Sequence, residues 1–272
     1  MGELETLRIE RDGHVAEVVL NRPGKGNALS PRLFEELEIA FGRLDEDEGV
    51  RAVVLRGEGK AFSYGLDLQE AMGELGPLVG GGLAGPRMKL RAMIQRLQRQ
   101  TASPARCRKP VVAAVHGWCI GGGLDIISAC DLRFCSADAR FSLREARIGI
   151  VADIGSLQRL PRIIGDAATR ELALTAKDID AERAMRLGLV SEILPDVEGL
   201  LERARQEARA MAELPPLVVQ GVKHILDAQD GLTIEQGLAY VANWNSAFLA
   251  SEDFGEAIGA FFERRAPRYK GA

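Results

Sequence analysis

The chain has 272 residues, of which 46% are hydrophobic and 27% charged, a composition typical of a globular protein that can bury a core. Its net charge of −4 and its aromatic content of 5% argue against a basic, base-stacking surface for nucleic acid. We expect a cytoplasmic location, because residues 1–10 do not resemble a signal peptide, no apolar run could span a membrane, and residues 268–272 lack a peroxisomal signal.

The cysteines and histidines do not indicate a metal site. There are three histidines, and the four cysteines contain no Cys-x-x-Cys pair. We therefore expect no metal or redox cofactor, and reduced cysteines that suit an intracellular setting.

The first half of the chain alternates short strands with helices, which predicts an α/β fold. Ser30 offers an N-cap, Pro31 takes the first helical position, and apolar residues then recur at helical spacing as far as Leu44. The strand candidates are residues 15–20, 51–56, 111–115, 133–135 and 139–142.

Two unusual segments follow the second strand. Residues 72–86 contain six glycines and two prolines, which predicts a mobile loop. Residues 87–109 contain eight basic residues and no acidic one, and their first part, residues 88–100, favours a helix. The basic residues either form a solvated helix face or provide a positive field for a polyanionic ligand.

The C-terminal part of the sequence is almost wholly helical. We therefore divide the chain into a core, residues 1–199, and a helical region, residues 200–272, that covers the core or another subunit. The predicted helices are residues 200–214, 216–229, 234–249 and 252–264.

Three acidic residues are candidates for proton transfer: Asp125, Glu145 and Asp153. Asp125 and Asp153 stand among strongly apolar neighbours, where a carboxylate is seldom found without a partner or a function. Carboxyl groups that converge in an apolar pocket can move protons, because burial and mutual repulsion separate their pKa values.

Each of the three acids also has a structural explanation. Asp125 suits the first turn of a helix, and Asp153 could cap a helix that begins near Gly155. Glu145 could form a surface ion pair with Arg144 or Arg147.

Two segments could supply backbone hydrogen-bond donors. The glycine triplet 121–123 opens an apolar segment that can be helical, and residues 61–68 follow a strand, so amides near Gly122 and Leu66 could form an oxyanion hole. The structural alternatives are close helix–strand packing at the triplet and an N-cap at Asp67.

Taken together, these segments resemble the crotonase (enoyl-CoA hydratase/isomerase) superfamily over nearly the whole chain. The region from the glycine triplet to the third acid is most similar to Δ3,5,Δ2,4-dienoyl-CoA isomerase, which has Asp, Glu and Asp at the positions of Asp125, Glu145 and Asp153. The segments that carry the resemblance are 21–30 (NRPGKGNALS), 59–68 (GKAFSYGLDL), 109–117 (KPVVAAVHG), 121–133 (GGGLDIISACDLR), 153–161 (DIGSLQRLP) and 262–267 (FERRAP).

The resemblance implies a spiral of β-β-α turns with a helical C-terminal region, assembled as a homotrimer or a dimer of trimers. It implies an oxyanion hole at the amides of Leu66 and Gly122, with Glu145 as the base at C2, Asp153 as the acid at C6 and Asp125 tuning both. Coenzyme A is then part of the substrate, and no separate cofactor is implied. The residues implied in substrate binding are Lys25, Ala28, Tyr64, Gly65, Asp67 and Leu68.

Three other functions remain open at this point. Asp125 and Glu145 could hold a water for enoyl-CoA hydration, with Asp153 structural. Residues 87–109 could bind RNA, although the low aromatic content and acidic balance disfavour this. The protein could also bind acyl-CoA without turnover, but three intact carboxylates argue against that.

Overall fold

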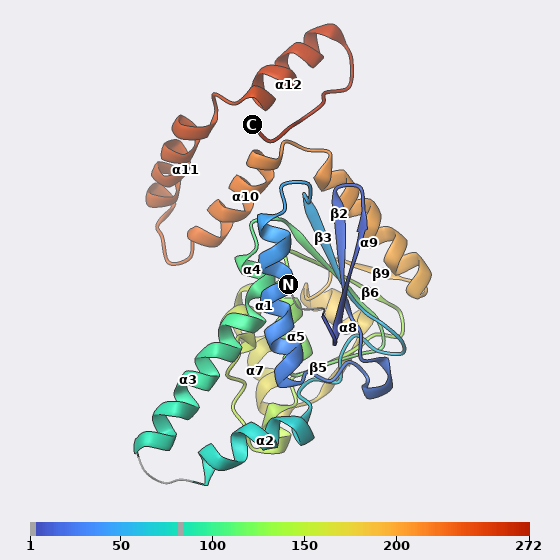
Figure 1. Ribbon diagram of the computed structural model, residues 1–272, viewed down its shortest axis with the longest axis vertical. Coiled ribbons are helices and arrows are strands. Elements are labelled where there is room, and N and C mark those ends of the chain that lie inside the picture. Colours follow the sequence, from blue (N-terminus) through green and yellow to red (C-terminus); the bar gives the residue numbers. More distant parts are fainter. Residues whose placement is uncertain (1–3, 81–83) are drawn as a thin grey trace.

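The computed structural model describes residues 4–80 and 84–272, which are built around a six-stranded sheet (Figure 1). β1 and β2 pair antiparallel, and every other neighbouring pair runs parallel. In spatial order the strands are β1 (Leu7–Asp12), β2 (Val15–Leu20), β3 (Ala52–Gly57), β4 (Val111–Val115), β6 (Leu132–Ser136) and β9 (Glu192–Leu194). β2, β3 and β4 are buried throughout, which is why they read as nearly continuous apolar runs and were predictable.

A second sheet has three short strands, β5 (Trp118–Ile120), β7 (Arg140–Ser142) and β8 (Asp178–Asp180), in the order β5-β7-β8. The chain passes from β4 to β5 and again from β6 to β7, so it alternates between the two sheets. A bridge between Ser63 and Cys119 also draws the segment after β3 onto the small sheet. This alternation produces a spiral of strand pairs and confirms the expected α/β architecture.

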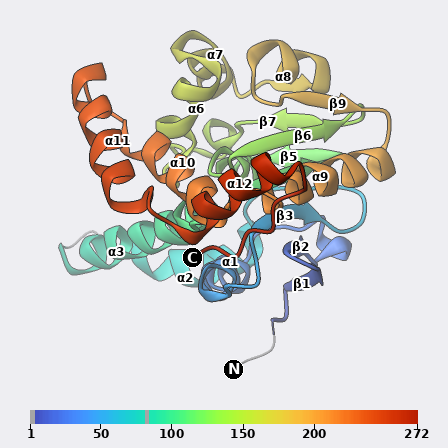
Figure 2. The same cartoon turned by 90° about the horizontal axis from the view of Figure 1, so that it is seen from above.

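Helices cover both faces of the large sheet (Figure 2). Because side chains alternate along a strand, Val112 and Ala114 of β4 face one side and Ala113 and Val115 face the other. The first side packs against α9 (Val197–Ala212) and the second against the main core, which includes α1 (Pro31–Glu46). The remaining short helices are η1 (Pro23–Lys25), α4 (Ser103–Arg106), α5 (Gly122–Ser128), η2 (Glu145–Ile148), α6 (Ser156–Ile164), α7 (Asp166–Thr175) and α8 (Ala181–Leu187).

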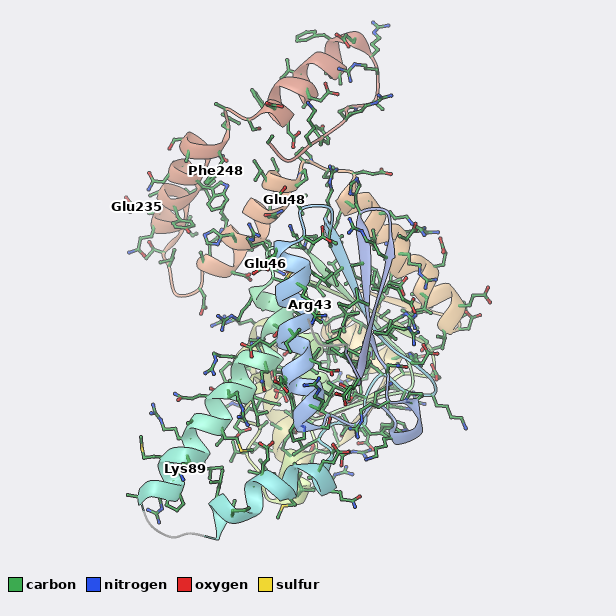
Figure 3. All side chains as sticks on the ribbon, viewed as in Figure 1. Arg43, Glu46, Glu48, Lys89, Glu235 and Phe248 are labelled. Carbon is green, nitrogen blue, oxygen red and sulfur yellow. The ribbon has the colours of Figure 1, made fainter. Side chains whose placement is uncertain are left out.

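The prediction of a loop over residues 72–86 is wrong for most of that segment. α2 (Leu68–Val79) and α3 (Ala84–Thr101) form a helical arm that projects from the core, and residues 81–83 lie outside the described residues. The helix α2 forms despite Pro77 and its glycines because it begins at an Asp67 N-cap and packs along α3. Figure 3 shows Lys89 at the outer end of this arm.

The four predicted C-terminal helices are confirmed within three residues at each end. They are α9, α10 (Pro216–Ala228), α11 (Ile234–Phe248) and α12 (Glu252–Glu263). The proposed division after residue 199 falls inside α9, whose Leu200 and Ala204 pack on the sheet, so the helices that extend away from the core begin with α10 (Figures 1 and 3). None of the helices in the described part of the chain is both long and apolar enough to cross a membrane.

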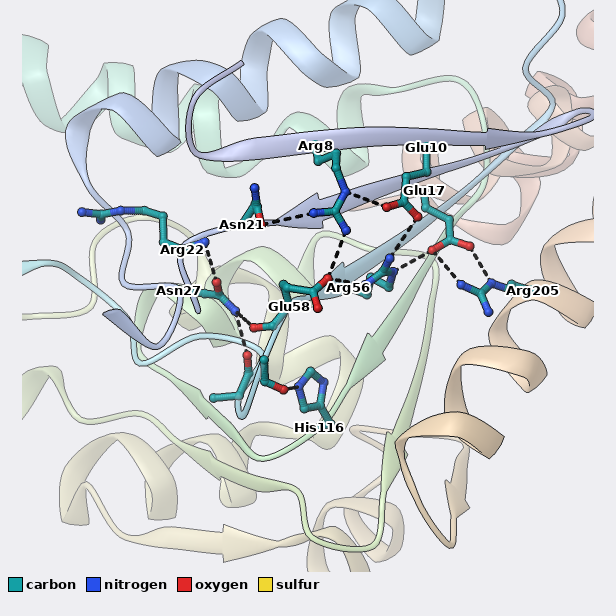
Figure 4. A network of polar contacts seen from close by, with 12 residues as sticks. Arg8, Glu10, Glu17, Asn21, Arg22, Asn27, Arg56, Glu58, His116 and Arg205 are labelled. Atoms are coloured by element: carbon teal, nitrogen blue, oxygen red, sulfur yellow. Dashed lines mark hydrogen bonds and ion pairs between the residues drawn. The ribbon is translucent and has the colours of Figure 1, made fainter. Parts of the chain in front are cut away.

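A network of ion pairs ties β2 and β3 to α9 (Figure 4). Glu17 accepts hydrogen bonds from Arg56 and from Arg205, each at 2.6 Å from the guanidinium Nε. Further along, the Asn27 side chain donates to the carbonyls of Glu58 and Ala61. Asn27 thereby fastens the loop after β2 to the loop after β3, which carries one of the candidate amide donors.

Candidate active site

The two candidate oxyanion donors, the amides of Leu66 and Gly122, lie on segments held together by the small sheet. Gly65 has φ +82°, and a Cβ added to it would lie 2.7 Å from the Ile120 carbonyl oxygen and 3.7 Å from the Gly122 nitrogen. The backbone of Gly65 therefore packs directly against residues 120–122, and only glycine permits both the conformation and the approach.

The direction of each amide follows from its local structure. Gly65 O and Asp67 N are both bonded to Leu29, so the N–H of Leu66 between them points to the other side of the segment. Gly122 is the first residue of α5, where the helix offers no partner for its N–H. Neither amide donates a hydrogen bond to another described residue, so both are free to bind a carbonyl oxygen.

Asp125, on the first helical turn of α5, is completely buried. Its Oδ1 accepts a hydrogen bond from the Ser156 amide at the start of α6, while Oδ2 has no partner among the described residues. Burial raises the pKa of Asp125 from 3.8 to about 6, although the hydrogen bond from the Ser156 amide and the charge of Arg159 act in the opposite direction.

Glu145 begins η2, and its carboxyl group lies against the glycine triplet. A Cβ added to Gly121 would be 3.0 Å from Glu145 Oε1, which places this carboxyl next to the residue that precedes the Gly122 amide. Its Oε2 is shielded from solvent and has no hydrogen-bond partner in the described chain. Burial, and then the charges of Asp125 and Asp153, raise the pKa of Glu145 from 4.5 to about 7.

Asp153 is half-buried in the segment that leads into α6. Its backbone carbonyl accepts a hydrogen bond from Gln98 Nε2 of α3 at 2.7 Å, which fixes this segment to the helical arm. Burial raises the pKa of Asp153. The charge of Asp153 also raises the pKa values of Asp125 and Glu145, whereas the pKa of Asp153 itself is raised by burial alone.

The structural alternatives for Glu145 and Asp153 are wrong. Arg144 and Arg147 pair with Asp178, at 2.8 Å and 3.8 Å respectively, and neither pairs with Glu145. Asp153 does not cap α6, because Gly155 occupies the N-cap position and the Ser156 amide is bound by Asp125 instead. The structural alternatives for Asp125 and Asp67 are confirmed. Asp125 lies in the first turn of α5, and Asp67 caps α2 by accepting a hydrogen bond from the Glu70 amide.

The candidate substrate-binding residues lie on three segments: the loop that contains η1, the loop after β3 and the start of α2. Lys25 is already paired with Glu70 at 2.7 Å and with Asp67 at 3.6 Å, so its charge is partly neutralised. Tyr64 is 47% exposed, and its ring occupies the space above Gly26 where a side chain would begin. Ala28 binds Arg22 through its carbonyl, and Leu68 is also 47% exposed.

Sequence reasoning missed two members of this environment. The Ser156 amide binds Asp125, and Arg159 places a partly buried guanidinium near it. The only signal for either was their position shortly after Asp153, three and six residues further along the chain. In residues 4–80 and 84–272, no group of three or more His, Cys, Asp or Glu side chains is arranged to hold a metal ion.

Comparisons with known proteins identify the family. A family model described as Enoyl-CoA hydratase/isomerase matches residues 10–272, so the chain belongs to the enoyl-CoA hydratase/isomerase family. The chain is 43% identical to the mitochondrial Delta(3,5)-Delta(2,4)-dienoyl-CoA isomerase of Dictyostelium discoideum, over 97% of this chain and 91% of the relative. It is 42% identical to the peroxisomal protein of the same description from Arabidopsis thaliana, over 98% and 96%.

Solved structures agree with this family and confirm the predicted crotonase-like fold. The structure of an enoyl-CoA hydratase from Bacillus anthracis superposes with a TM-score of 0.89 at 30% identity, covering 98% of this chain and all of the other. An enoyl-CoA hydratase structure from Streptomyces coelicolor gives the same TM-score and identity over all of this chain and 96% of the other.

Proposed function

We propose that this protein is an acyl-CoA double-bond isomerase that converts 3,5-dienoyl-CoA to 2,4-dienoyl-CoA in fatty acid degradation. One observation carries the proposal: the carboxyl of Glu145 lies against Gly121, next to the unbonded amide of Gly122, and its pKa is raised by burial and by the charges of Asp125 and Asp153. The high identity to proteins named dienoyl-CoA isomerases supports the same reaction.

In the proposed mechanism, the thioester carbonyl oxygen accepts hydrogen bonds from the amides of Leu66 and Gly122. Glu145 removes a proton from C2, and the resulting dienolate places its charge on that oxygen, where the two amides stabilise it. Asp153 then protonates C6. The electrons of the broken C2–H bond form the C2–C3 double bond, those of the C3–C4 double bond move to C4–C5, and those of the C5–C6 double bond form the new C6–H bond.

The active form of the Glu145–Asp153 pair holds one proton, because Glu145 must accept a proton and Asp153 must donate one. In the substrate-free site, the pKa of about 7 lets Glu145 retain a proton near neutral pH. An acyl chain that displaces the remaining water from half-buried Asp153 would raise the pKa of Asp153 further, and so move that proton to the acid. The pair should therefore give a bell-shaped pH profile with two macroscopic pKa values.

A turnover assay tests the function. Purified protein is given 3,5-dienoyl-CoA and 2-trans-enoyl-CoA thioesters of several chain lengths, and the formation of the conjugated 2,4-dienoyl product is followed. Faster isomerisation than hydration is expected. Hydration of the 2-trans-enoyl thioester without isomerisation would replace this proposal with the hydratase alternative.

We also propose that the chain assembles as a homotrimer or a dimer of trimers through its C-terminal helices. Support comes from the apolar side chains that these helices leave uncovered in the single chain, such as Ile234 at 85% exposure and Phe261 and Phe262 at 77% and 78%. Light scattering on the purified protein would measure the molar mass, and a monomer would exclude this assembly.

The remaining expectations from sequence stay predictions. Coenzyme A enters only as part of the substrate, and we expect activity without added metal or redox cofactor. Binding of nucleic acid is not expected. A cytoplasmic location also stays a prediction, and cell fractionation would test it, since relatives are named mitochondrial and peroxisomal.

A further inference from the structure

Arg159 is a partly buried cation near Asp125, and the proposed mechanism does not use it. Its Nη1 is shielded from solvent and has no hydrogen-bond partner among the described residues. The guanidinium occupies the space in which a side chain at Gly155 would begin, so it lies directly against the turn formed by residues 153–156. That turn carries Asp153 at one end and, at the other, the Ser156 amide that binds Asp125.

The charges around Asp125 show why a cation is needed there. Glu145 of η2 and Asp153 are acidic, and Cys119 of β5 stays neutral because burial raises its pKa well above 9.0. Among the cations of the described chain, Arg159 of α6 has the largest effect on Asp125, and the attraction is mutual. A completely buried carboxylate without such a counter-charge would take up a proton.

We infer that Arg159 is a positioning residue: its charge keeps Asp125 ionised, and ionised Asp125 holds the Ser156 amide and with it the turn that carries Asp153. This inference rests on the proposed function, in which Asp153 is the acid. It divides the three carboxyls into two kinds. Glu145 and Asp153 exchange protons with the substrate, while Asp125 remains charged and keeps the acid in place.

The experiment compares Arg159→Gln, which removes the charge, with Arg159→Lys, which keeps it. Arg162→Gln is the matched control, because Arg162 lies on the same helix but is exposed and pairs with Asp230. Carbon-13 NMR of labelled aspartate and glutamate carboxyls measures the titration of Asp125 and Glu145 without any turnover. The dependence of kcat and KM on pH is measured beside it.

In Arg159→Gln, we expect the titration of Asp125 to move up by about one pH unit, the lower end of the effect of a close opposite charge. The acidic limb of the kcat profile should move in the same direction, while KM changes less than twofold. Arg159→Lys and Arg162→Gln should both resemble the wild type.

Two results would overturn the inference. One is an Asp125 titration that is the same in Arg159→Gln as in the wild type, or that moves equally in the Lys and Gln variants. The other needs only the wild-type protein, and so does not depend on a variant that folds: Glu145 losing its proton at lower pH than Asp125. If the wild type isomerises no dienoyl-CoA, the proposed function fails, and the NMR titration still decides whether Arg159 keeps Asp125 charged.

Discussion

Glu145→Gln should strongly reduce turnover and at the same time make the protein more stable at high pH. Glutamine keeps the shape of the side chain but cannot accept the C2 proton, so kcat should fall by about 10²–10⁴, the usual contribution of a general base. The stability gain follows from the pKa of Glu145, which burial raises from 4.5 to about 7. At about 1.4 kcal/mol per pH unit, ionising this group in the folded protein costs about 3 kcal/mol.

The direction of the Glu145 pKa shift determines how the unfolding free energy depends on pH. A carboxyl whose pKa is raised in the folded state destabilises the protein only where the unfolded state is ionised and the folded state resists ionisation. The cost is therefore absent below pH 4.5, grows as the pH rises to about 7, and is then constant. Glu145→Gln removes it, so the variant should gain about 3 kcal/mol of unfolding free energy at pH 8 and nothing at pH 4.

Urea denaturation of the wild type and the variant at a series of pH values measures this difference. The matched control is Glu36→Gln, which also changes a buried glutamate, but one that accepts hydrogen bonds from the backbone of Glu5, Thr6 and Leu7. That control should lose stability at pH 8. A Glu145→Gln variant that is no more stable than the wild type at pH 8, or that gains equally at pH 4, would refute the reasoning.

Three further predictions concern the acid, the oxyanion hole and the anchor of α10. Asp153→Asn should lower isomerisation by about 10²–10⁴ with acyl-CoA binding retained, and wild-type turnover would remove Asp153 from the mechanism. Gly65→Ala places a Cβ 2.7 Å from the Ile120 carbonyl oxygen, at a residue with φ +82°. The Leu66 amide should therefore shift, and kcat should fall by about 10². Unchanged kinetics would show that the Leu66 amide does not stabilise the transition state. Lys223 of α10 donates hydrogen bonds to Pro104 O, Lys109 O and Asp131 Oδ2. Lys223→Met should therefore lower the unfolding free energy, measured by urea denaturation, by about 3–5 kcal/mol. A loss below about 1 kcal/mol would show that α10 packs on the core without this residue.

Much of the fold could be predicted because its signals are local. The α1 helix begins where Ser30 accepts from the Leu33 amide and Pro31 follows, as the sequence indicated. The β2 and β4 strands were visible as short β-branched runs. The β8 and β9 strands were missed because three residues are too few to show a period, and α2 was missed because its glycines and Pro77 outweigh a helical signal that only packing against α3 restores.

The site was less predictable than the fold. The sequence shows which residue types are present, but only the tertiary structure shows which of them lie close together. Asp125, Glu145 and Asp153 were candidates from the sequence itself, but each also had a structural explanation, and only the resemblance favoured proton transfer. The approach of Glu145 to Gly121 depends on how η2 follows the small sheet, and no spacing in the sequence encodes it. Arg159 could not be selected from the sequence either, because a basic residue on a short helix is usually exposed.

Burial alone does not distinguish the proton-transfer carboxyls from the structural ones. Glu36 is completely buried, yet its pKa is lowered, because hydrogen bonds from backbone amides and from Thr6, together with Arg32, outweigh the cost of burial. Glu145 is less buried, but its Oε2 has no partner in the described chain, and its pKa is raised. A carboxylate with all its hydrogen bonds satisfied has no reason to accept a substrate proton at neutral pH, whereas an unsatisfied one gains free energy when it does. The same lack of partners that makes Glu145 a suitable base therefore makes it a source of instability, and the stability of the fold must come from fully bonded groups such as Glu36 and from the packed core.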